Sequence, residues 1–210
     1  MLRSQVPGLA VETGLAPSPR VPYSLLRNEE RGAALLEFAI SLPILVVFVV
    51  GIYDFSGAFN QKQKIAQAAQ EGAIIAGAQP TSDFVPAPPV GSAGPYSLQT
   101  VATAVFNSLV GSGVLPSGTC SAPGTASAGA GLTWTYTISG CNSAYSSDNL
   151  IITINRGWVS GTAPAAVGSS VAVQYPYHWR FNSVIQLLVP GASYAATTQL
   201  IESATVHNQM

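Results

Sequence analysis

The sequence has few charged residues: 17 of its 210 residues are Asp, Glu, Lys or Arg. Ordinary soluble domains contain roughly 25% of these residues, so the surface of a typical cytosolic enzyme is excluded. The net charge of −1 provides no basic field to attract nucleic acid. Because 48% of the residues are hydrophobic, the chain is also not a charge-driven disordered protein.

Histidine is equally scarce, which limits the chemistry available. His178 and His207 are the only two histidines, and neither H-E-x-x-H, G-x-S-x-G nor a Walker lysine occurs. The carboxylates Asp83, Asp148 and Glu202 are far apart in the sequence, so no pair for acid–base work is indicated. We therefore expect no enzyme activity, no metal site and no cofactor.

The chain has two cysteines, Cys120 and Cys141, and no C-x-x-C motif. Their spacing suits one disulfide, which would stabilise the fold by roughly 3 kcal/mol in the chain-entropy model. A disulfide would place this part of the chain in an oxidising compartment. The alternative is a pair of free, buried thiols.

Charge is not only scarce but unevenly placed, because 12 of the 17 charged residues lie in residues 1–71. Within that region the run from Ala33 to Tyr53 contains one ionisable residue, Glu37. As a helix the run would be about 31 Å long, which matches a hydrocarbon core about 30 Å thick. We predict a single membrane span at 33–53. A buried core helix is the alternative, and it is disfavoured because the run is apolar on every face.

Residues 1–32 before the span are predicted to be an unstructured leader, since they contain four prolines and no sustained periodicity. The small excess of Arg and Lys on that side places the N-terminus in the cytoplasm. The helix begins at about Ala34 and is predicted to continue through 54–79 as an extracytoplasmic extension. We expect the two acidic side chains of this extension, Asp54 and Glu71, to be exposed to solvent.

The extension carries a stripe of small residues, Ala66, Ala69, Ala73 and Ala76. Such a stripe allows close approach of another helix, or it packs on the protein's own domain, and both readings remain open. Residues 80–96 contain five prolines and are predicted to be a linker. Residues 97–111 are predicted to form a second helix, with Ser97 as its cap, Gly111 as its stop and an apolar face of Leu98, Val101, Val105, Phe106 and Leu109.

From about residue 131 the apolar residues tend to recur at every second position instead of every third or fourth. This alternation indicates strands at 132–139, 149–155, 171–179 and 193–206. Residues 97–210 are therefore predicted to form an extracytoplasmic α+β domain with an antiparallel sheet of about four strands. The aromatic run at 175–181 either lines the core with alternate residues or binds a partner or glycan. In the first case His178 and Arg180 point outward, and they are the residues we assign to a partner surface.

The junction at Gly32 is the most specific feature of the sequence. A polar leader ends there, an apolar helix starts at once, and Glu37 is the fifth residue after the glycine, within RGAALLEFAISLPILVVFVVGIYDF. Together with QKIAQAAQEGA and, more weakly, the run Val171–Pro176, this pattern resembles the type IV prepilins and, among them, the TadE-like pseudopilins of the tight-adherence pilus system. The chain departs from that family in its long leader and in Phe38, where related pseudopilins often have Tyr.

The resemblance implies a pilin-like domain and cleavage by a prepilin peptidase between Gly32 and Ala33. Glu37, one helical turn from the new amino group of Ala33, could pair with the amine of a neighbouring subunit and set the register of assembly; the alternative is a hydrated acid at the headgroup level. Pro43 is predicted to kink or soften the span.

The expected function is that of a TadE-like minor pilin or pseudopilin in the assembly of an adhesion pilus. Its expected partners are a prepilin peptidase, other pilin subunits with their assembly platform, and membrane lipid. The expected location is the bacterial inner membrane, with one span and the C-terminal domain in the periplasm. The alternative function is a signal-anchored binding module for a glycan or an envelope partner.

Overall fold

The computed structural model describes residues 23–84, 93–161, 166–188, 191 and 197–208. The chain divides into two compact units, residues 1–45 and residues 46–210. Helix α1 (Tyr23–Ala78) has residues in both units.

Helix α1 begins earlier than the sequence predicted, at Tyr23 instead of about Ala34. Its first turns belong to the leader that was expected to be unstructured. The physical reason is composition, because the last proline of the leader is Pro22 and the next nine residues are rich in Leu, Arg and Glu, which favour helix. The rest of the predicted leader, residues 1–22, lies outside the described residues.

The apolar part of α1 is exposed along the predicted span. The helix is unbroken at Pro43, and its most apolar stretch has none of its residues buried. Among the described residues it is the one helix that is long and apolar enough to cross a membrane. Burying such a surface in lipid is strongly favourable, so the structure is consistent with a single-pass membrane anchor.

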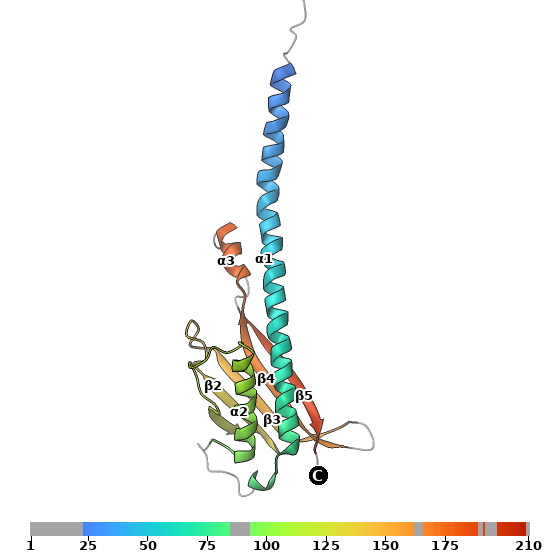
Figure 1. The fold of residues 1–210 in the computed structure, drawn as a ribbon, viewed down its shortest axis with the longest axis vertical. Coiled ribbons are helices and arrows are strands. Elements are labelled where there is room, and N and C mark those ends of the chain that lie inside the picture. Colours follow the sequence, from blue (N-terminus) through green and yellow to red (C-terminus); the bar gives the residue numbers. More distant parts are fainter. Residues whose placement is uncertain (1–22, 85–92, 162–165, 189–190, 192–196, 209–210) are drawn as a thin grey trace, which may run out of the picture. The chain divides into compact units, whose positions relative to one another are not determined.

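The second unit contains a five-stranded antiparallel sheet in the order β1-β2-β3-β4-β5 (Figure 1). The strands are β1 (Thr125–Ala128), β2 (Thr133–Ser139), β3 (Asn149–Val159), β4 (Val167–His178) and β5 (Thr197–His207). The α+β class is confirmed, with one strand more than the four expected. The extra strand, β1, has the sequence TASA and pairs with β2; it is too short and too poor in large side chains to show a pattern of its own.

One face of the sheet is covered by α2 (Tyr96–Gly111) and the C-terminal part of α1. The predicted apolar face of α2 is confirmed, since four of its five residues are fully buried and Phe106 packs against them. Ala69, Ala73 and Ala76 of α1 are also fully buried in this core. The small-residue stripe therefore packs on the protein's own domain.

Gly72 shows how closely α1 approaches its neighbours. A Cβ at this position would overlap the side chain of Val105 on α2 and lie 3.2 Å from Cγ1 of Val171 on β4. At the open edge of the sheet, Glu202 of β5 forms an ion pair with Lys62 of α1, with an N···O distance of 3.0 Å. An inward charge of this kind also discourages pairing with further strands at the edge.

Part of the predicted linker between α1 and α2 forms regular structure. It contains a 3₁₀ turn, η1 (Ser82–Phe84), while residues 85–92 lie outside the described residues. Ser97 is not the cap of α2, because the N-cap residue is Pro95. Instead, the backbone N–H and the hydroxyl of Ser97 both donate to the carboxylate of Asp83, at 2.8 and 2.9 Å. A carboxylate near the N-terminus of a helix also interacts favourably with the helix dipole.

Candidate functional site

The residues of the proposed cleavage and assembly site all lie on α1 in the first unit. Ala33 and Glu37 are exposed and one helical turn apart. A Cβ at Gly32 would meet no atom within 4 Å, so this position tolerates a larger side chain. Glu37 forms no ion pair with another described residue.

A second site begins at Asp54, the first residue after the predicted span. Asp54 is only 1% exposed. One carboxylate oxygen accepts a hydrogen bond of 2.9 Å from the hydroxyl of Tyr177, and the other accepts one of 2.8 Å from the backbone N–H of Phe181. The expectation that Asp54 is solvated is therefore wrong, whereas Glu71 is exposed as expected.

The Asp54 carboxylate also affects its tyrosine partner. Burial, and then the hydrogen bond and negative charge of Asp54, raise the pKa of Tyr177 to about 12. The phenol of Tyr177 is therefore protonated, and can donate to Asp54, at higher pH than an ordinary tyrosine. A Cβ at Gly57, one turn further along α1, would lie 2.7 Å from the Tyr177 hydroxyl, so the small residue there leaves room for the ring.

Next to this network, aromatic side chains connect α1 with the segment that follows β4. The rings of Phe55 and Trp179 meet edge to face with centroids 5.2 Å apart. Phe181 is the first residue of α3 (Phe181–Leu188), and a Cβ at Gly51 would lie 3.9 Å from its ring. Gly51, Asp54, Phe55, Trp179 and Phe181 enclose a small cleft of about 130 Å³.

His178 lies in a different environment from the one predicted. Its Nε2 is 2.7 Å from the buried carboxylate of Asp148, and its ring stacks on Tyr145 with centroids 3.6 Å apart. The side chain is 22% exposed, so His178 does not point freely outward as expected. No local sequence pattern signals this contact, because 30 residues separate His178 from Asp148.

The predicted disulfide is confirmed and lies in the same part of the domain. Cys120 and Cys141 are joined, with their Cα atoms 4.8 Å apart. Cys141 is fully buried, and its carbonyl oxygen accepts a hydrogen bond from the Thr119 hydroxyl at 3.0 Å. The bridge thereby ties the segment before β1 to the loop that carries Tyr145 and Asp148.

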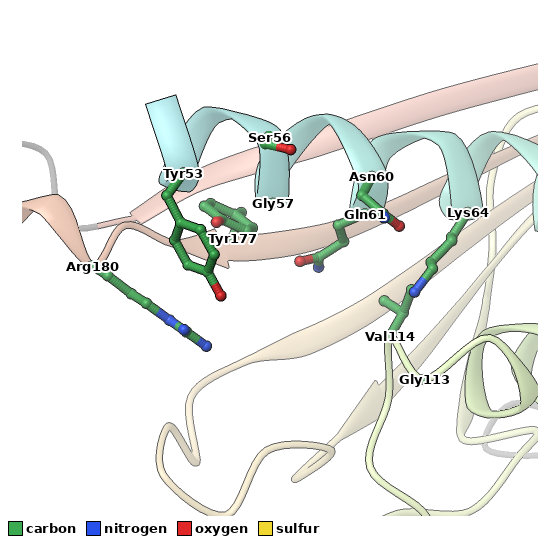
Figure 2. A pocket seen from close by; sticks show the side chains of 10 residues that line it. All are labelled: Tyr53, Ser56, Gly57, Asn60, Gln61, Lys64, Gly113, Val114, Tyr177 and Arg180. Atoms are coloured by element: carbon green, nitrogen blue, oxygen red, sulfur yellow. The ribbon is translucent and has the colours of Figure 1, made fainter. Parts of the chain in front are cut away.

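An open groove runs between α1 and the loops beside it. Figure 2 shows Tyr53, Gln61 and Lys64 extending from α1 toward the space that Arg180 enters from the other side. This groove has a volume of about 400 Å³. A neighbouring groove of about 480 Å³ shares Gln61, Val114, Tyr177 and Arg180 with it and continues to Tyr145 and Trp179.

The two grooves are polar and carry positive charge. Lys64 and Arg180 belong to their walls, and among the described residues no carboxylate does. Arg180 is exposed, so it points outward as predicted. Such walls fit an anionic or hydroxylated partner. Within the described residues no cluster of three His, Cys, Asp or Glu side chains could hold a metal ion.

Comparison with known proteins gives one match. No curated protein and no solved structure matches the chain significantly. A protein-family model described as TadE-like protein matches residues 32–73. That segment begins at the glycine of the proposed cleavage site and covers the apolar span, Asp54 and the start of the packed alanine stripe. Residues 32–73 are thus similar to a TadE-like protein, in agreement with the resemblance seen in the sequence.

Proposed function

We propose that this protein is a TadE-like minor pilin or pseudopilin that helps to assemble an adhesion pilus. The observation that carries the proposal is the coincidence of two features on α1. The TadE-like match starts at Gly32, and the most apolar stretch of the helix has no buried residue. A helix of this kind requires lipid or other apolar helices around it.

The proposed arrangement has the N-terminus in the cytoplasm, one span in the bacterial inner membrane and residues 97–210 in the periplasm. The disulfide between Cys120 and Cys141 supports an oxidising compartment for the domain. The proposed partners are a prepilin peptidase, other pilin subunits with the assembly platform, and membrane lipid. The proposed role is structural and requires no cofactor.

Cleavage is tested first, by determining the N-terminus of the mature protein in cells with and without a prepilin peptidase. We expect Ala33 as the first residue only when the peptidase is present. Gly32→Leu should block cleavage, and because the surroundings of Gly32 are open, the variant should still fold. A wild-type protein that keeps residues 1–32 in cells with the peptidase would contradict the proposal.

The assembly role is tested at Glu37. We expect Glu37→Ala to be cleaved normally but to lose piliation and crosslinking between subunits, because the acid can no longer pair with the amino group of a neighbour. Glu71→Ala is the matched control, since Glu71 is an exposed acid on the same helix. Normal pili in the Glu37→Ala strain would refute the assignment of Glu37.

The grooves favour a second candidate function, a signal-anchored binding module for a glycan or an envelope partner. Tyr145, Tyr177 and Trp179 offer aromatic faces there, beside the amides of Gln61 and Asn142. This function would need neither cleavage nor assembly. Retention of the leader, together with ligand binding that is lost in Arg180→Glu, would favour it over the pilin function.

A further inference from the structure

We propose that α3, with Trp179 and Arg180 before it, is a second membrane contact, seated in the headgroup layer of the leaflet from which α1 emerges. The proposal rests on the membrane anchorage of α1. The proposal goes beyond anchorage because α3, a separate segment of the chain, would hold the domain against the lipid surface.

The first argument is the height of α3 along α1. The ring of Phe181 lies beside Gly51, which is inside the predicted span. The backbone N–H of Phe181 is bonded to Asp54, the first residue after the span. These contacts place the start of α3 beside the end of the predicted span, so a membrane that surrounds residues up to Tyr53 would reach the start of α3 as well.

The second argument is the composition of this region. Helix α3 has the sequence FNSVIQLL, with no charged residue. Phe181, Val184 and Ile185 follow the spacing i, i+3, i+4 and therefore share one face, and each is only partly buried by the protein. Burial of such a face at the boundary between headgroups and acyl chains is favourable in proportion to its apolar area.

The third argument is an aromatic belt at the same height. Ile52, Tyr53, Phe55 and Phe59 are all exposed, between 57% and 71%. From Tyr53 to Phe59 the helix rises about 9 Å, slightly more than the roughly 5–8 Å of one headgroup layer. Trp179 packs on Phe55 within this layer. Tyr and Trp are the residues enriched at membrane interfaces, where one end of the side chain is apolar and the other is hydrated.

The polar groups of the region fit a headgroup environment too. Asp54 would be repelled by lipid phosphates, but it is shielded by Tyr177 and Phe181. Trp179 donates its indole N–H to the Thr198 hydroxyl at 2.7 Å and so leaves no unsatisfied donor. Arg180 is exposed, and a guanidinium at this height can bind the phosphate oxygens of phospholipids. Chemically, the region therefore matches a phospholipid surface.

The test uses the full-length protein in vesicles of phosphatidylethanolamine with a minor fraction of phosphatidylglycerol. A nitroxide is attached to Val184→Cys on the apolar face of α3, to Gln186→Cys on its polar face, or to Val46→Cys in the span. Peptide mapping confirms that Cys120 and Cys141 stay paired. The collision rates of each nitroxide with oxygen, which concentrates in lipid, and with a water-soluble nickel chelate then report its depth.

We expect the label at Val184 to collide several-fold less with the nickel chelate than the label at Gln186, and to lie shallower than the label at Val46. Equal access of the chelate to both α3 labels, with the Val46 label protected, would overturn the contact while leaving the anchor intact. An accessible label at Val46 would overturn the anchor and the contact together.

A matched pair of variants provides a second measurement. Ile185→Glu places a charge on the apolar face, whereas Gln186→Glu places the same charge on the polar face. With the nitroxide at Val184, we expect Ile185→Glu to raise nickel access to the level of a water-exposed site and Gln186→Glu to leave it unchanged. The proposal is overturned if both variants, or neither, raise nickel access.

Discussion

The hydroxyl of Tyr177 donates a hydrogen bond of 2.9 Å to the carboxylate of Asp54, across 123 residues of sequence. The same carboxylate accepts the backbone N–H of Phe181 at 2.8 Å. These bonds join α1, at the end of its apolar stretch, to the end of β4 and the start of α3. The buried acid therefore ties the long apolar helix to the sheet of the domain.

Asp54→Asn should destabilise the domain, because it removes the charge that strengthens both hydrogen bonds. We expect the free energy of unfolding to fall by about 1.5–3 kcal/mol, as measured by urea or thermal unfolding of the full chain in detergent. Glu71→Gln, at an exposed acid of the same helix, should change it by less than about 0.5 kcal/mol. Equal effects of the two variants would show that the Asp54 bonds contribute nothing specific.

Stability should also fall in alkali because of Tyr177. The pKa of Tyr177 is raised to about 12 in the folded protein, against about 10 in an unfolded chain. The folded state therefore binds this proton more tightly than the unfolded state does. The stability that the protonated phenol contributes to the fold is complete below pH 10 and is lost as pH rises through 12. Burial raises the pKa of Tyr136 and Tyr175 as well, so they act in the same direction.

The measurement is the unfolding temperature as a function of pH, with tyrosinate absorbance followed in parallel. In Asp54→Asn we expect Tyr177 to titrate at a lower pH, because the hydrogen bond and charge of Asp54 contribute to its raised pKa. Tyr177→Phe should have a shallower loss of stability between pH 10 and 12 than the wild type. An unchanged slope in that variant would contradict the assignment.

Loss of the disulfide should be costly. We expect the double substitution of Cys120 and Cys141 by Ser to lower the free energy of unfolding by roughly 3 kcal/mol in the chain-entropy model, because the unfolded chain gains freedom. A reducing agent should destabilise the wild type by a similar amount and leave the double variant unaffected. Sensitivity of the double variant to the reducing agent would be inconsistent with this explanation.

Gly72→Ala should destabilise the core although alanine is the better helix former. The added Cβ would overlap Val105 and approach Val171, and overpacking of this kind typically costs about 1–3 kcal/mol, against a gain of about 1 kcal/mol in helix propensity. Gly111→Ala is the matched control, since a Cβ at Gly111 meets no atom within 4 Å. Urea unfolding of both variants should separate them; a stabilised Gly72→Ala would disprove the close packing.

Local patterns accounted for much of the fold. The apolar span, the face of α2 and the alternating strands were predicted because helix and strand periodicities are properties of neighbouring residues. The pairing of Cys120 with Cys141 followed from there being only two cysteines. The start of α1 at Tyr23 was not predicted, because the prolines before it suggested an unstructured leader. Strand β1 was not predicted, because its four residues show no pattern apart from their pairing with β2.

The sequence by itself determined an exposed apolar helix with a glycine and an acid at its start, a second helix and an antiparallel sheet, because these depend on composition and short-range spacing. Only the tertiary structure decided which polar residues are buried and with whom. Asp54 resembled any solvated acid at a helix end, and His178 an outward-facing residue at the end of a strand. Their partners lie 123 and 30 residues away, and a buried charge is tolerated only where distant segments fold together to supply its hydrogen bonds.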